Sequence, residues 1–71
     1  MINLAVYKSI ELVGTSDKNW ADAVRAAYDE AKKTLRGIRN IEIITSDVKV
    51  KEDVDKLIYR VRVRLNFQLE K

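Results

Sequence analysis

The sequence predicts an α+β domain of β-α-β-β order, in which a three-stranded sheet with spatial order 1-3-2 packs on one helix. Three observations predict this fold class. The end of the chain alternates strictly between apolar and polar residues, a stretch near the middle carries one helical apolar stripe, and two looser alternating segments flank that stretch. Residues 1–71 are expected to form a single domain.

The alternating stretch runs from Leu57 to Glu70, and its odd positions are all apolar. The even positions are mostly polar and include Arg60, Arg62 and Arg64. Because successive side chains of a strand point to opposite faces, this pattern predicts one long strand with an apolar face and a basic face.

The segments before this strand supply a neighbouring strand and the helix that packs on its apolar face. A first strand is expected over Asn3–Val13, followed by a helix of about 20 residues that Ser16 caps and Gly37 ends. Apolar residues at spacings of three and four form the helix stripe, with Trp20 in the core rather than on a ligand platform; the stripe comprises Trp20, Val24, Ala27, Ala31 and Leu35.

A second strand is expected over Ile38–Val50, and its apolar phase changes between its two halves. This change predicts a bulge near Ile44–Ser46. A right-handed crossover through the helix makes the first two strands parallel, so the third pairs antiparallel with both from the middle. Its apolar face, including Val63 and Phe67, then lies under the helix, and its arginines point away.

The composition excludes several classes of function. The chain has no histidine and no cysteine, so no catalytic residues, no metal ligands and no disulfides are predicted, and an enzyme is not expected. The net charge of +3 is mild, which argues against nucleic acid as a partner. No apolar run is long enough to span a membrane, so a cytoplasmic protein is expected. A core this small leaves self-association as the available means of stabilisation.

The arginine row on the long strand has two interpretations. Arg60, Arg62 and Arg64 would stand about 7 Å apart on one face, where like charges repel. In the first interpretation Glu11 and Glu42, which have the right parity on the neighbouring strands, neutralise them. In the second the row binds an anionic ligand such as a phosphate.

Four segments carry a resemblance to a known family. Val6–Ser16 reads VYKSIELVGTS and resembles the VYKxIELVGTS opening of the dodecins; Trp20–Ala23, Thr34–Arg39 and Tyr59–Leu69 match later motifs of the same family. The likeness covers nearly the whole chain. It implies the β-α-β-β fold, assembly into hollow homododecamers, and the binding of flavins, stacked in pairs, for storage or quenching rather than catalysis.

The chain departs from that family at the positions that the resemblance assigns to the flavin. The usual tryptophan after I-R is Asn40, the usual glutamine after the strand tyrosine is Arg60, and the arginine often found in F-R-L is Gln68. The resemblance therefore implies a self-assembling storage shell in which FMN or riboflavin binds weakly, with Arg60 favouring the phosphate of FMN. The alternative is a structural homo-oligomer that has lost flavin binding.

Overall fold

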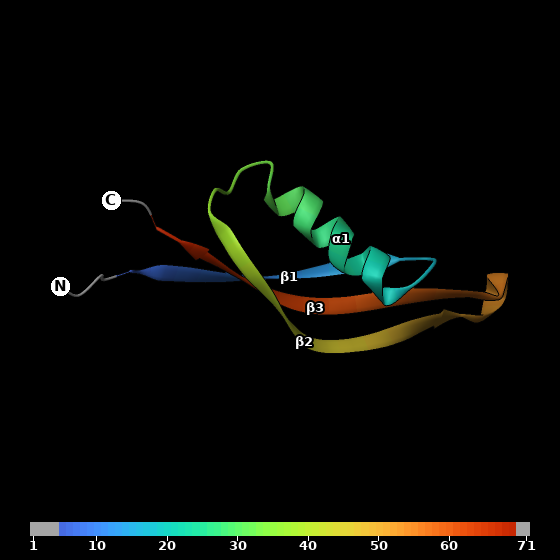
Figure 1. Cartoon of the computed structure of the whole chain (residues 1–71). Coiled ribbons are helices and arrows are strands. Elements are labelled where there is room, and N and C mark those ends of the chain that lie inside the picture. Colours follow the sequence, from blue (N-terminus) through green and yellow to red (C-terminus); the bar gives the residue numbers. More distant parts are fainter. Residues whose placement is uncertain (1–4, 70–71) are drawn as a thin grey trace.

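The computed structural model describes residues 5–69 and contains one helix and three strands (Figure 1). Both β1 and β2 pair antiparallel with β3, so the sheet order is β1-β3-β2 and the predicted fold class is confirmed. In chain order the elements are β1 (Tyr7–Ser16), α1 (Trp20–Ala31), β2 (Ile38–Lys51), the short 3-10 helix η1 (Glu52–Val54) and β3 (Lys56–Gln68).

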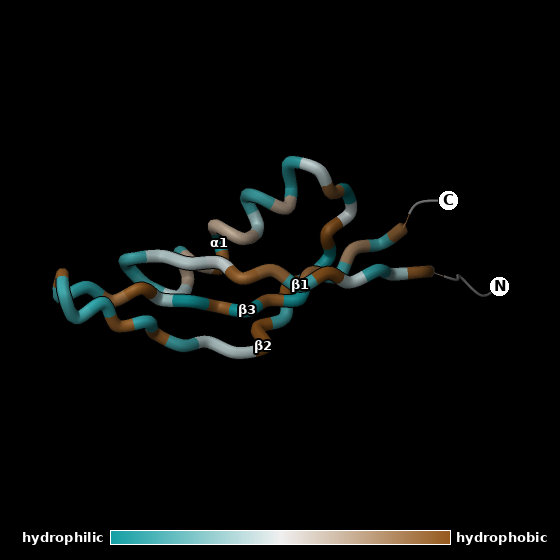
Figure 2. The backbone as a smooth tube through the Cα atoms, turned by 180° about the vertical axis from the view of Figure 1, so that it is seen from behind, coloured by the Kyte–Doolittle hydropathy of each residue, from teal (hydrophilic) through white to brown (hydrophobic). Residues whose placement is uncertain are grey.

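The alternation of β3 divides the sheet into two faces, and the hydropathy along this strand alternates in Figure 2. The odd residues face the helix, and four of them form most of the core together with three helix alanines. These buried residues are Val61, Val63, Leu65, Phe67, Ala23, Ala27 and Ala31. The expected burial of Val63 and Phe67 is therefore confirmed.

Trp20 does not lie in the core, contrary to the sequence-based expectation. Trp20 is 44% exposed, and Ala23, not Trp20, begins the buried stripe of α1. Alanines on this face let the helix backbone approach the sheet closely, and such a close approach leaves no room beneath it for an indole.

The helix begins later and ends earlier than predicted. Asn19 is its N-cap, because the Asn19 side chain accepts a hydrogen bond from the backbone N–H of Asp22 at 2.7 Å. Ser16 instead accepts from the backbone N–H of Lys18, in the turn before the helix. After Ala31 the chain leaves the helix, and Gly37 takes the predicted left-handed conformation with φ of 74°.

The strand ends also differ from the prediction. β1 continues through Gly14 to Ser16, where a break was expected after Val13. The predicted start at Asn3 and the predicted end of the last strand at Glu70 lie outside the described residues. The predicted bulge in β2 is confirmed, since the register shifts between Ile43 and Thr45. A second shift, between Ile38 and Asn40, was not predicted.

The chain is elongated for its length. Its radius of gyration is 15.2 Å and its extents are 60 × 21 × 14 Å, whereas a compact domain of this size has a radius of about 11 Å. The hairpin of β2 and β3 runs on beyond the helix as an arm (Figure 1). Among residues 5–69 no helix has the length and apolar character needed to cross a membrane.

Candidate ligand-binding face of the sheet

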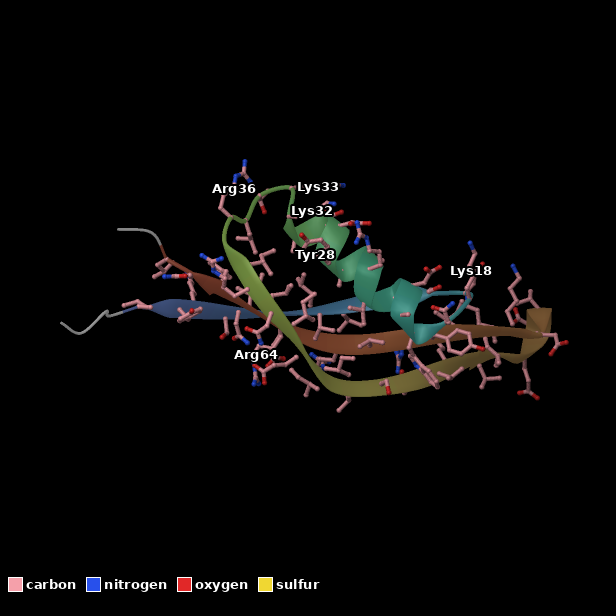
Figure 3. The ribbon with its side chains drawn as sticks, viewed as in Figure 1. Lys18, Tyr28, Lys32, Lys33, Arg36 and Arg64 are labelled. Carbon is pink, nitrogen blue, oxygen red and sulfur yellow. The ribbon has the colours of Figure 1, made fainter. Side chains whose placement is uncertain are left out.

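The face of the sheet turned away from the helix carries the arginine row. Arg60, Arg62 and Arg64 occupy alternate positions of the central strand, and Arg64 points away from the helix in Figure 3. Tyr28 of α1 and Lys32, the residue that caps the end of this helix, lie by contrast on the other side of the sheet (Figure 3). The orientation predicted for the row is therefore confirmed.

Acidic side chains of the two edge strands pair with this row, as the first interpretation of the sequence expected. Glu11 of β1 lies opposite Arg64 and contacts its Nη2 at 3.2 Å. The other oxygen of Glu11 lies 3.7 Å from Nη1 of Arg62. Glu42 of β2 lies 3.8 Å from Nη1 of Arg64. Neutralisation by Glu11 and Glu42 is thus found, though these side chains remain well exposed to water.

The strongest contact on this face was not predicted. Asp47 accepts two hydrogen bonds from Arg60, at 2.7 Å from Nε and 2.6 Å from Nη2. This two-point contact is the favoured geometry between a guanidinium and a carboxylate. The hydrogen bond lowers the pKa of the Asp47 carboxyl below its ordinary value and raises the pKa of Arg60.

The bulge in β2 explains why Asp47 faces Arg60. Glu42 faces the arginine row at an even position, and strict alternation would place Asp47 on the opposite face. The extra residue at Ile44 reverses the parity, so Thr45 pairs with Arg62 and Asp47 pairs with Arg60. The sequence contained the signal for this arrangement in the phase change of the apolar residues.

Polar side chains continue the row towards the end of β3. The Asn66 side chain donates to Glu42 at 2.8 Å and accepts from the hydroxyl of Ser9. Gln68 accepts a hydrogen bond from Nε of Arg39 at 3.1 Å. Every even position from Arg60 to Gln68 is therefore engaged with an edge strand through hydrogen bonds or ion pairs.

The three positions that the resemblance assigned to the flavin share this face but do not converge on one point. Asn40 lies opposite Asn66, two residues from Gln68 on the central strand. Arg60 is eight residues from Gln68 along the same strand, about 26 Å at the usual rise. Within one subunit, therefore, Asn40 and Gln68 are neighbours and Arg60 stands apart.

Trp20 connects the start of the helix to the same region. Its indole N–H donates to the backbone carbonyl of Asp47 at 3.1 Å. Its ring meets that of Tyr59 edge to face, with centroids 5.3 Å apart and an interplanar angle of 84°. Asp47 thus binds Trp20 through its backbone and Arg60 through its carboxylate. This double role was not predicted.

Comparison with known proteins identifies relatives over almost the whole chain. The family model described as Dodecin matches residues 6–70. A protein called Calcium dodecin from Mycobacterium tuberculosis is 30% identical over 66 residues, which cover 93% of this chain and 92% of that protein. A protein called Dodecin from Thermus thermophilus is 37% identical over 70 residues, covering 92% of this chain and 93% of that protein.

Solved structures agree with these sequence matches. Dodecin from Streptomyces coelicolor superimposes with a TM-score of 0.88 at 28% identity, covering 99% of both chains. The structure of the M. tuberculosis protein superimposes with a TM-score of 0.82 at 31% identity, covering 92% of this chain and 91% of that one, and is described as having a novel calcium-binding site. Within residues 5–69 of the present chain, no three Asp or Glu side chains are grouped as a metal site.

Proposed function

The chain belongs to the dodecin family, and from that premise we propose that it assembles with copies of itself into a shell that binds and stores a small ligand. The chemistry of the candidate face favours binding rather than catalysis, because its polar groups are ion pairs and hydrogen-bonded amides. We further propose that the shell contains twelve subunits, as the family resemblance implies.

The observation that carries the assembly is the arm formed by the ends of β2 and β3. Val50 and Leu57 face each other across this arm and are 65% and 46% exposed. Val54, at the tip, is 54% exposed. Apolar side chains gathered at one end of an extended hairpin indicate contact with another protein surface. A second copy of the chain is the proposed occupant, since an elongated 71-residue subunit has little core of its own.

The ligand of the shell is proposed to be a flavin, or a related small molecule, held between subunits. The separation of Arg60 from Asn40 and Gln68 supports a site completed by a neighbouring copy. Asn40 offers no aromatic face, so stacking contributes less than it does where a tryptophan occupies this position. Weak flavin binding is the expected result.

A second candidate function is a structural homo-oligomer that has lost the flavin. The two-point contact between Arg60 and Asp47 favours this alternative, because Asp47 neutralises the charge of Arg60 and takes up two of its five N–H donors. In that case the polar face of the sheet serves only to stabilise the subunit and its contacts.

Native mass spectrometry of freshly purified protein tests both the assembly and the ligand. A particle close to twelve times 8.2 kDa is expected. An additional mass matching FMN or riboflavin supports the storage shell, whereas a clean apoprotein mass supports the structural oligomer. A stable monomer at micromolar concentration contradicts both.

A pair of variants connects the assembly to the arm. Leu57→Ser removes an exposed apolar side chain from the helix-side face of β3 and is expected to shift the mass distribution towards smaller species. Lys56→Ser, at the adjacent position on the opposite face, is the matched control and is expected to leave the assembly intact. Equal effects of the two changes would contradict the role given to the arm.

A further inference from the structure

We propose that a hollow on the arginine face binds a tetrahedral oxyanion such as phosphate, with Arg62 as its principal donor. The hollow has a volume of about 150 Å³ and is lined by Val13, Thr45, Asp47, Arg60 and Arg62. It lies within one subunit and uses residues of all three strands. The inference therefore does not rest on the proposed shell or on any flavin.

Arg62 is the least satisfied member of the arginine row. Arg60 donates two short hydrogen bonds to Asp47, and Arg64 donates one to Glu11. Arg62 has only a 3.7 Å ion pair with Glu11, which is too long for a hydrogen bond. Among residues 5–69 it donates no side-chain hydrogen bond, although a guanidinium carries five N–H donors.

The neighbours of Arg62 leave space above it. Val13 of β1 and Thr45 of β2 flank Arg62 directly on the two edge strands. Both side chains are shorter than that of Arg62, so they leave space beside its guanidinium. A hollow of about 150 Å³ is roughly ten times the space that a single water needs. The space is sufficient for a phosphate group.

The charge and the donors of the hollow suit a dianion. Two arginines and one aspartate line it, which gives a local excess of positive charge. A planar guanidinium donates to two oxygens of a phosphate at once, and the Thr45 hydroxyl provides another donor on the rim. Arg60 stands about 7 Å along the strand from Arg62, so it adds attraction at longer range.

Asp47 limits the strength of this site. Its carboxylate neutralises Arg60 and presents negative charge at the rim of the hollow. Removal of that charge frees the Arg60 guanidinium and removes the repulsion of the incoming anion. Asp47 is therefore expected to act as an internal competitor of the ligand, so its replacement by asparagine should tighten binding.

The probe for this site is inorganic phosphate, observed by ³¹P NMR line width on addition of the full-length protein. Ionic strength is held constant with sodium chloride, so that general screening does not change. Arg62→Gln is expected to weaken binding at least tenfold, and Asp47→Asn to tighten it several-fold. Arg25→Gln removes the same charge from the exposed face of the helix and is expected to change the affinity less than twofold.

A second variant of Arg62 and a second phosphate probe complete this test. If Arg62→Gln does not fold, Arg62→Lys keeps the charge but loses the planar fork, and an intermediate affinity is expected. Methyl phosphate in place of inorganic phosphate distinguishes a free ion from a phosphate ester as the natural ligand. The proposal is overturned if chloride competes as well as phosphate, if Arg62→Gln and Arg62→Lys bind as the unmodified protein does, or if Arg25→Gln weakens binding equally.

Discussion

Gly14 of β1 lies directly beneath the helix residue Ala23. A Cβ atom added to Gly14 would stand 2.0 Å from the carbonyl oxygen of Ala23, far inside any allowed contact. This glycine is paired with Val61 in the regular strand and is buried. The helix backbone can rest on the sheet only because this position has no side chain.

Gly14→Ala is therefore expected to push the helix away from the sheet. Overpacking of this kind costs about 1–3 kcal/mol of unfolding free energy, and more where backbone atoms must move. Urea unfolding followed by circular dichroism measures the loss. Thr15→Ala, at the next position and on the exposed face of the same strand, serves as the control with a much smaller expected effect. Equal midpoints for the two variants would contradict this packing.

A second prediction compares two leucines of the central strand that share the helix-side face. Leu65 is fully buried, so Leu65→Ala is expected to lower the unfolding free energy by about 2–5 kcal/mol. Leu57 is 46% exposed in the subunit, and Leu57→Ala is expected to affect assembly more than the stability of the subunit. Unfolding curves at one fixed protein concentration make the comparison valid. A smaller loss at Leu65 than at Leu57 would mean that the core is wrongly placed.

The contact between Asp47 and Arg60 predicts a specific dependence of stability on pH. Because the pKa of Asp47 is lowered in the folded state, its contribution is present above the ordinary aspartate pKa and is lost as the pH falls through the lowered value. The stability difference between the unmodified protein and Asp47→Asn should therefore shrink between about pH 5 and pH 2. Thermal unfolding across this range measures it.

The control for this pH series is Asp53→Asn. Asp53 lies in the exposed turn between β2 and β3 and makes no ion pair among the described residues. Its replacement is expected to leave the pH profile unchanged. A difference between Asp47→Asn and the unmodified protein that stayed constant down to pH 2 would exclude the charge of Asp47 as its cause. Because both partners are substantially exposed, added salt should also reduce the difference.

The topology was predictable because the strongest patterns of the sequence are periodic. The alternation from Leu57 onward identified the central strand and its two faces, and a crossover helix then left one strand order. Glu11 and Glu42 were placed correctly because each lies on a stretch of strand whose parity could be counted.

The errors concern features that depend on contacts rather than on periodicity. The partnership of Asp47 with Arg60 was missed because one bulged residue reverses the parity of the rest of β2. Trp20 was assigned to the core because its hydrophobicity fits a helical stripe, yet the close approach of Ala23 to Gly14 leaves the core to small residues. The flavin positions Asn40, Arg60 and Gln68 came from family resemblance alone, and a motif match carries no information on how far apart its residues lie in the fold.

The last prediction concerns the choice between FMN and riboflavin. From the sequence, a free guanidinium at Arg60 was expected to attract the phosphate of FMN and so to favour FMN over riboflavin. In the structure that guanidinium donates two hydrogen bonds to Asp47. The unmodified protein is therefore expected to bind both flavins weakly and alike, because Asn40 provides no stacking surface. Asp47→Asn should introduce a preference for FMN that fades with salt, since it leaves the charge of Arg60 uncompensated. Asn40→Trp together with Arg60→Gln should strengthen the binding of both flavins, because the tryptophan restores the aromatic face. Fluorescence quenching of each flavin on titration measures the affinities of all three proteins for both flavins, and tight riboflavin binding by the unmodified protein would place the pocket elsewhere.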